Sequence, residues 1–193
     1  MDKKKGILLV ALGTPRSCET EDVREYLKEF LGDPLVIQKP RWLWLPILNG
    51  IILKVRPQKS AEMYKQIWTD EGSPLMSYTI AQTEQLQGLR EDFDVHFAMT
   101  YGEPRIDKVI REMKESGVED ITVLPLYPQY SLTTVEPIIQ QVKKIDDKIN
   151  VIRDFHQIES YTDLLAESIR EKWQANHYDK LILSYHGIPL SYV

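Results

Sequence analysis

One histidine, His186, stands where a metal ion or a proton could be handled. It closes the apolar run 181–185, and Gly187-Ile188-Pro189 follows it. This break predicts an imidazole at the carboxyl end of a buried strand, where ligands collect in α/β sheets. Neutral imidazole binds borderline transition metals and accepts protons near neutral pH. A hydrogen-bonded core histidine would fit the same position, so both interpretations stay open.

Other polar and aromatic residues follow the earlier apolar runs. Gly13-Thr14-Pro15 makes a tight turn whose backbone N–H groups could face an anion, although the chain lacks GxGxxG and GK[ST] and so gives no support for a nucleotide site. His156 lies near a strand end and is a second candidate for the cleft. Three tyrosines at neighbouring strand ends either line an aromatic cleft or are structural: Tyr101, Tyr127 and Tyr130.

The spacings of a permanent metal site are absent, because the sequence contains no HxH, HExxH or CxxC. A metal would be held by single ligands from separate loops, which suits transient handling better than storage. The single Cys18 excludes an internal disulfide and fits a reducing cytosol, so we expect a cytoplasmic protein. The basic start, residues 1–6, has no small-residue cleavage site, and we expect no signal peptide.

Composition narrows the class of protein. A charged content of 27% with 42% hydrophobic residues is typical of a soluble globular domain, and the net charge of −5 gives no sign of a nucleic-acid partner. The apolar stretch 42–53 is interrupted by Pro46, Asn49 and Gly50 and is too short to span a bilayer.

The elements that would position these residues alternate between strands and helices. Nearly continuous apolar runs predict parallel strands at 7–12, 95–99, 121–126 and 150–153, with a fifth run at 181–185. Helical periodicity fills the gaps at 21–31, 78–90, 105–116, 134–145 and 160–173. The alternation predicts an α/β fold, a Rossmann-like four-stranded parallel sheet in the order 2-1-3-4 with helices around it.

Residues 34–75 break this alternation, and we call them the lip. The segment is rich in Trp and Pro and contains no predicted strand, so we expect short helices over the carboxyl edge of the sheet. Its tryptophans could be ordinary packing residues. An apolar surface beside several cations would equally suit a flat, apolar ligand with anionic edges; these cations are Lys39, Arg41, Lys54, Arg56 and Lys59.

Taken in order, several segments resemble ferrochelatases, which insert Fe²⁺ into a porphyrin in haem synthesis. They are LLVALGTP, EFLGDPLVIQKP, WLPILNGIIL, RPQKSAEMYKQIW, EGSPL, AMTYGEP, VLPLYPQYS, VIRDFH and LSYHGIPLSYV, which together extend over essentially all 193 residues. The resemblance implies two similar Rossmann-like domains with the active cleft between them. Residues 1–156 would be the first domain, with the lip as an insertion, and 157–193 the incomplete start of the second.

The resemblance also implies roles for single residues. His186 would be the catalytic histidine that ligates the metal, accepts pyrrole protons, or both. Arg56, Lys59 and Ser73 would contact porphyrin propionates, and Tyr101 and Tyr130 would line the substrate cleft. Thr100 stands where many relatives have arginine, so a charged contact expected there is absent. A glutamate that faces the histidine in relatives belongs to a part of the second domain not included in these residues.

The resemblance therefore predicts a lyase-type metal chelatase that inserts Fe²⁺ into protoporphyrin IX, with porphyrin and ferrous iron as substrates. No permanently bound cofactor and no iron–sulfur cluster are expected, and the lip could touch a membrane peripherally. A coproporphyrin or cobalt chelatase is an alternative within the class. A non-catalytic tetrapyrrole-binding fragment or pseudo-enzyme is an alternative outside it, since the facing glutamate and half the cleft are missing. As a chelatase, the chain would have the missing second domain or a complementing chain as a partner. A flavodoxin-like phosphate binder is disfavoured by the missing glycine-rich loop.

Overall fold

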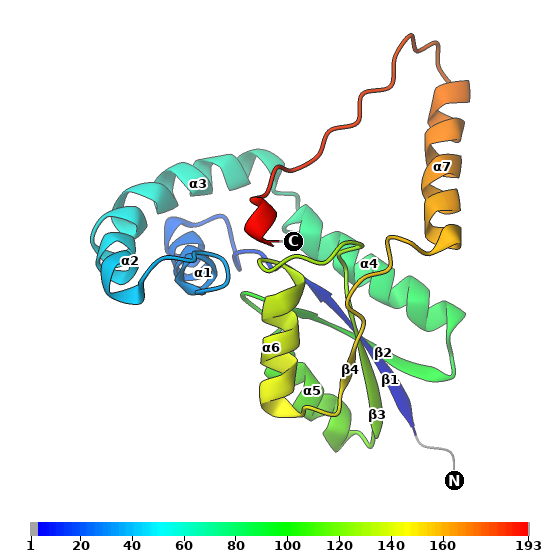
Figure 1. Ribbon diagram of the computed structural model, residues 1–193, viewed down its shortest axis with the longest axis horizontal. Helices are drawn as coiled ribbons and strands as arrows, with labels where there is room; N and C mark the ends of the chain where they lie inside the picture. Colours follow the sequence, from blue (N-terminus) through cyan, green and yellow to red (C-terminus); the bar gives the residue numbers. More distant parts are fainter. Residues whose placement is uncertain (1–3, 193) are drawn as a thin grey trace.

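Four parallel strands form a single sheet in the computed structural model, which describes residues 4–192 (Figure 1). The strands are β1 (Lys5–Ala11), β2 (Phe93–Met99), β3 (Asp120–Pro125) and β4 (Asn150–Val151). Their order is β2-β1-β3-β4, which confirms the predicted fold class and strand order. The predicted strand at 150–153 is shorter than expected, because only Asn150 and Val151 pair with β3.

Helices cover both faces of the sheet, because the crossovers are right-handed and run from β1 in two opposite directions. α5 (Ile106–Glu115) and α6 (Val135–Ile145) share one core cluster with Leu8 and Val10 of β1. α4 (Pro74–Leu89) belongs to the connection from β1 to β2, which runs in the opposite direction and so covers the other face. Burial on both sides explains why β1 is continuously apolar rather than alternating.

The lip folds into one nearly continuous helical run beside α1 (Thr20–Gly32), not into separate short helices. The run consists of α2 (Arg41–Ile47), the π-helix η1 (Leu48–Ile52) and α3 (Leu53–Ile67). Its buried side chains pack against those of α1 in a second core cluster. Figure 1 shows this pair of layers beyond the carboxyl ends of the strands.

Side chains satisfy the backbone groups that helix ends and prolines leave without partners. Pro57 has no N–H for the carbonyl of Leu53 one turn earlier, and the Arg24 Nε donates to that oxygen at 3.0 Å. The carbonyl of Leu31, in the last turn of α1, accepts from Trp44 Nε1 at 2.8 Å. Arg24 and Trp44 therefore fix the lip against α1 from both directions.

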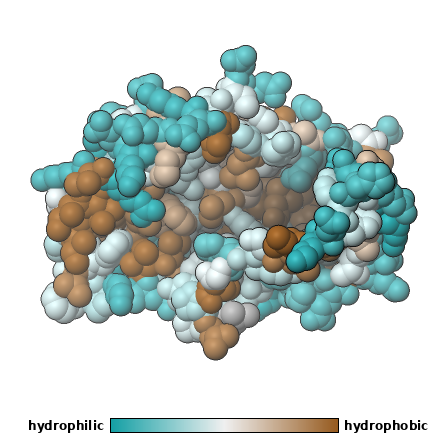
Figure 2. Space-filling model, turned by 90° about the horizontal axis from the view of Figure 1, so that it is seen from above, coloured by the Kyte–Doolittle hydropathy of each residue, from teal (hydrophilic) through white to brown (hydrophobic). Residues whose placement is uncertain are grey.

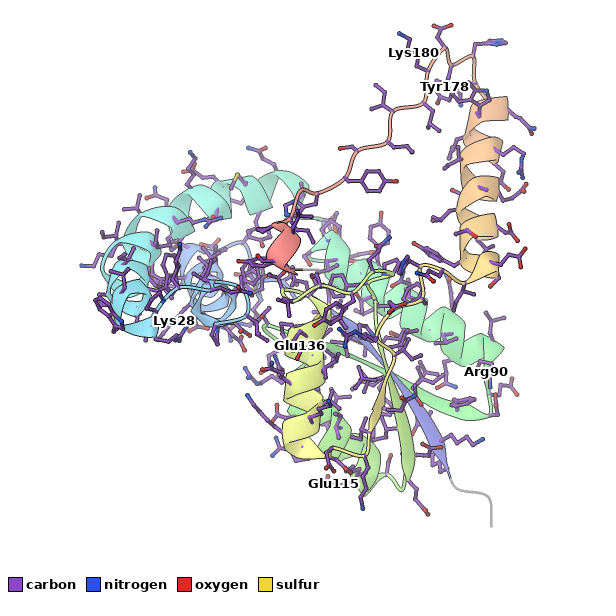
Figure 3. All side chains as sticks on the ribbon, viewed as in Figure 1. Lys28, Arg90, Glu115, Glu136, Tyr178 and Lys180 are labelled. Carbon is purple, nitrogen blue, oxygen red and sulfur yellow. The ribbon has the colours of Figure 1, made fainter. Side chains whose placement is uncertain are left out.

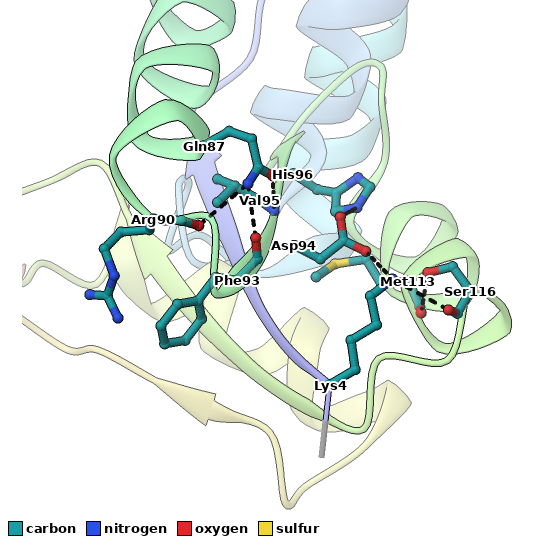
Figure 4. Close-up of polar contacts among 9 residues, drawn as sticks. All are labelled: Lys4, Gln87, Arg90, Phe93, Asp94, Val95, His96, Met113 and Ser116. Atoms are coloured by element: carbon teal, nitrogen blue, oxygen red, sulfur yellow. Dashed lines mark hydrogen bonds and ion pairs between the residues drawn. The ribbon is translucent and has the colours of Figure 1, made fainter. Parts of the chain in front are cut away.

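The edge of the sheet at β2 is partly closed by hydrogen bonds from outside the sheet (Figure 4). The Gln87 side chain donates to the Phe93 carbonyl and accepts from the Val95 N–H, both at 2.9 Å. Further along, the Met99 N–H donates to the carbonyl of Pro104 at 2.7 Å. Gln87 thus occupies the place that a residue of a further strand would take.

The part of the chain that carries His186 does not form the predicted strand. α7 (Glu159–Gln174) is followed by irregular chain and then by the 3₁₀ turn η2 (Leu190–Tyr192). Residues 181–185 pair with no strand among the described residues, and Ile182 is 85% exposed. The expectation of a buried strand there was wrong in this structure, because a strand needs a neighbour to satisfy its backbone. No helix within residues 4–192 is long and apolar enough to cross a membrane.

Candidate functional site

The loops that follow β1 and β2 touch each other at the carboxyl edge of the sheet. The Tyr101 N–H donates to the Leu12 carbonyl at 3.0 Å. Gly13 has a φ of 107°, and a Cβ added there would overlap the Tyr101 carbonyl oxygen. The glycine in this turn is therefore required by the close approach of two backbones, as well as by its backbone angle.

Three tyrosines lie beneath this edge, the buried Tyr26 and Tyr101 and the partly buried Tyr127, and we call them the buried tyrosines. Burial raises the pKa of each of them, and they are close enough for their ionised forms to repel one another. The Tyr101 hydroxyl donates to Asp33 Oδ2 at 2.9 Å, and that carboxylate raises its pKa further. The Tyr127 hydroxyl is buried with no hydrogen-bond partner among the described residues.

Tyr101 is only 2% exposed, so the predicted cleft tyrosine lies below the surface in this structure. Ser73 is 4% exposed and caps α4, where its hydroxyl accepts from the Met76 N–H at 3.2 Å. Both groups are already engaged within the chain. Contact with a bound molecule would have to be added to these hydrogen bonds or replace them.

A cavity of about 470 Å³ opens between α1, the start of α4 and the loops after β1 and β2. Its lining includes Ser73 and Trp68, and five of the lining residues are acidic. Two arginines in the lining are paired, Arg16 with Asp22 at 2.6 Å and Arg105 with Glu29 at 2.9 Å. The excess of carboxylates gives the cavity negative charge; the acidic residues are Asp22, Glu25, Glu29, Glu71 and Glu103.

The lip presents an apolar face to solvent, visible as the hydrophobic patch at the left of Figure 2. Along its helices a row of exposed side chains repeats every four residues: Ile51, Val55, Lys59, Met63 and Ile67. Trp42, which is 79% exposed, extends the apolar surface. Arg56 lies next to this row, and neither Arg56 nor Lys59 has an ion pair within residues 4–192. The predicted propionate contacts are therefore exposed cations on an apolar face.

Tyr130 is half-buried in the loop between β3 and α6. Its hydroxyl donates to Glu136 Oε2 at 2.9 Å. The guanidinium carbon of Arg153 lies over its ring, 3.8 Å from the ring centroid, in a cation–π contact. Partial burial and the Glu136 carboxylate raise the pKa of Tyr130. Arg153 was not among the residues predicted to contact a substrate.

His186 is exposed in the irregular segment, with no hydrogen bond to any residue among 4–192. Six residues later the chain returns to the loop between β3 and α6, where the Leu132 N–H donates to the Tyr192 carbonyl at 2.9 Å. The segment with His186 is thus anchored beside the loop of Tyr130. His156 lies near that loop too, since its backbone N–H donates to the Pro128 carbonyl at 3.0 Å, and its Nδ1 is buried without a hydrogen bond in the described chain.

The predicted site residues lie near the carboxyl edge of the sheet, but they do not all contact one another. Ser73 lies in the acidic cavity, Arg56 and Lys59 lie on the lip, and Tyr130 adjoins the C-terminal turn. Within residues 4–192 no group of three or more His, Cys, Asp or Glu side chains is placed to hold a metal ion. Sequence reasoning missed Asp33, although its position in the Gly-Asp-Pro break after α1 could have suggested a partner for a buried hydroxyl.

The fold and these residues define an α/β protein with a parallel sheet, a cavity at the carboxyl ends of its strands and a helical lip beside it. Comparison with protein families makes this specific, because the family model described as ferrochelatase matches residues 4–193. The chain belongs to the ferrochelatase family.

Similar curated proteins carry two names. The coproporphyrin III ferrochelatase of Lactococcus lactis subsp. lactis is 90% identical over 193 residues, which is all of this chain and 62% of that protein. A coproporphyrin III ferrochelatase of Limosilactobacillus reuteri is 47% identical over 99% of this chain and 61% of its own length. The ferrochelatase of Vibrio atlanticus is 45% identical over 97% of this chain and 61% of its own. The chain thus spans about three fifths of the length of these relatives.

Proposed function

We propose that this chain is part of a lyase-type chelatase that inserts Fe²⁺ into coproporphyrin III. The observation that carries the proposal is the 90% identity, along the whole chain, to a protein named coproporphyrin III ferrochelatase. Protoporphyrin IX, the substrate first expected, has less support, because a second relative at 47% identity has the coproporphyrin name as well.

The exposed face of the lip is chemically suited to a porphyrin. A porphyrin is a flat, apolar ring with carboxylates on its rim, and the row from Ile51 to Ile67 offers apolar side chains interrupted by Lys59. Arg56 beside this row adds a guanidinium, the group that best matches the geometry of a carboxylate. Both cations lack ion pairs within residues 4–192, so a carboxylate would not have to displace an internal partner.

The proposed reaction replaces two pyrrole protons with one ferrous ion. A ring nitrogen of the His186 imidazole would hold the incoming metal or take a pyrrole proton. Iron is a substrate here and must be released into the ring, which suits a single imidazole better than a closed set of ligands. Relatives are longer than this chain, and we propose that their additional residues complete the surroundings of His186.

Metal insertion by a chain extended to the length of its relatives tests the proposal. Anaerobic Fe²⁺ insertion would be measured with coproporphyrin III and with protoporphyrin IX. We expect coproporphyrin III to be the better substrate and His186→Ala to lower the insertion rate by about 100-fold or more, with porphyrin affinity nearly unchanged. His177→Ala, also an exposed histidine, is the matched control and should leave the rate unchanged. Equal insertion by the His186→Ala protein would refute the assigned role.

Assays of the 193-residue chain by itself would distinguish porphyrin binding from metal insertion. A one-sided cleft buries little more than one face of the ring, so we expect weak porphyrin binding. His186 lies exposed and unpaired in this chain, so we expect little metal insertion. Robust insertion that does not depend on His186 would contradict this and would also refute the need for additional residues. The non-catalytic alternative requires that the extended chain bind porphyrin without inserting iron. A cytoplasmic location and a peripheral membrane contact of the lip stay predictions.

A further inference from the structure

Two of the nine arginines have no polar partner among the described residues, and they are Arg56 and Arg153. Arg41 donates to the Gly32 carbonyl. The other six pair with carboxylates: Arg16, Arg24, Arg90, Arg105, Arg111 and Arg170. Arg56 lies on the lip, whereas Arg153 lies just past the end of β4, an edge strand of the sheet.

The guanidinium of Arg153 is held in place although it has no ion pair. It stacks on Tyr130 at 3.8 Å from the ring centroid. The Tyr130 ring is itself fixed by its hydrogen bond to Glu136, which lies at the amino-terminal end of α6 (Figure 3). A guanidinium that lies flat on an aromatic ring keeps its N–H edge free, and fixing the plane beforehand reduces the entropy lost when it binds a carboxylate.

From this geometry we infer that Arg153 binds a carboxylate of coproporphyrin III that protoporphyrin IX does not have. The inference rests on the function proposed above and names a residue that determines its substrate specificity. Coproporphyrin carries four propionates, and protoporphyrin carries two, with vinyl groups in place of the others. If Arg56 and Lys59 hold one pair at the lip, the additional propionates at the other side of the ring need cations away from the lip.

The position of Arg153 meets that need. Its stacking partner Tyr130 belongs to the loop that also contacts the C-terminal turn, through the Leu132–Tyr192 hydrogen bond. In Figure 1 the lip helix α3 and the chain that leaves β4 lie on opposite sides of that turn. Arg56 and Arg153, the two arginines without a polar partner among the described residues, thus lie on either side of the edge where the segment with His186 is anchored.

The other cations near this edge are less suitable. Arg16 and Arg105 line the acidic cavity and are already paired with Asp22 and Glu29. A carboxylate placed there would meet an excess of negative charge and would have to break an existing ion pair. Arg153 has no ion pair to break among the described residues.

Porphyrin binding by the chain extended to the length of its relatives tests the inference, with coproporphyrin III and the dicarboxylate deuteroporphyrin IX as probes. Fluorescence quenching would give both dissociation constants for the wild type, Arg153→Met and Arg153→Lys. We expect Arg153→Met to weaken coproporphyrin III binding by about tenfold and to leave deuteroporphyrin binding unchanged. Arg153→Lys keeps the charge but loses the flat stack, so its loss should be smaller. Arg111→Met removes an exposed, ion-paired arginine and is the matched control.

The outcomes separate this inference from the proposed function. If the wild type prefers coproporphyrin III and Arg153→Met keeps that preference, the assignment of Arg153 is wrong while the function stands. If the wild type binds both porphyrins equally, or binds neither, the proposed substrate and this inference both fail. Circular dichroism of each variant would show that the fold is unchanged, and a selective tenfold loss with an intact fold supports Arg153.

Discussion

Replacing Gly13 with alanine tests how tightly the loops after β1 and β2 are joined. The backbone angle φ of 107° is unfavourable for any residue with a Cβ and costs about 1–2 kcal/mol. The new Cβ would also overlap the Tyr101 carbonyl oxygen and lie 2.8 Å from its carbonyl carbon. Separating the two backbones adds about 1–3 kcal/mol. We therefore expect a loss of about 2–5 kcal/mol of unfolding free energy.

Two further glycines provide matched controls. Gly72 has a φ of 101° with nothing within 4 Å of an added Cβ, so Gly72→Ala should cost only the backbone strain, about 1–2 kcal/mol. Gly88 lies inside α4 in open space, and Gly88→Ala should stabilise the helix by about 0.5–1 kcal/mol. The three variants make the same chemical change in three different surroundings.

Urea unfolding of the wild type and the three variants would measure these differences. With a slope of about 2 kcal/mol per molar urea, Gly13→Ala should lower the midpoint by roughly 2 M. The slope should stay the same if only the folded state is affected. A Gly13→Ala protein no less stable than Gly72→Ala would show that the two loops can separate freely, and the reasoning from their close approach would be refuted.

Three other predictions concern stability and local order. The buried tyrosines have raised pKa values in the folded protein, so their contribution to stability is complete below about pH 10. As the pH rises above this value, the free energy of unfolding should fall by about 4 kcal/mol per pH unit. A spectrophotometric titration in which all tyrosines ionise near pH 10 without unfolding would contradict this. Arg24→Met leaves the Leu53 carbonyl without its donor and should cost about 1–2 kcal/mol in urea unfolding, whereas Arg111→Met should cost less than half as much. Hydrogen exchange of the 193-residue chain should be fast at 181–185 and slow in β1, and equal protection of the two segments would refute the exposed conformation.

The sheet could be predicted from the sequence because its strands are short apolar runs with a fixed spacing. β1 is buried on both faces, so its residues are almost all apolar, and the turn at Gly13 marks its end. The predicted strand order rested on the four apolar runs and the helical segments between them. The lip was less predictable, because Pro46 and Pro57 indicate helix ends in a sequence. The structure instead keeps Pro57 inside α3, with the Arg24 side chain supplying the missing donor.

The candidate site was predictable residue by residue but not as an arrangement. Resemblance named Tyr101, yet only the structure shows that its hydroxyl is committed to Asp33, 68 residues away in the sequence. The stack of Arg153 on Tyr130 likewise joins two strand ends, and no local pattern in the sequence signals it. The run at 181–185 has the composition of a strand, but composition cannot supply the neighbouring strand that its backbone needs.

The hydrogen bonds of Gln87 limit how the sheet could join another copy of itself. Growth into a fibre requires two available edges on every molecule, so that each copy receives one neighbour and offers a place to the next. At β2 the Phe93 carbonyl and the Val95 N–H are already occupied by one side chain, and the Met99 N–H by Pro104. The part of the β2 edge that these bonds occupy cannot pair with a further strand, so the edge at β4 is the more available of the two. Gln87 and Pro104 thus hinder a chain with much exposed apolar surface from polymerising through its sheet.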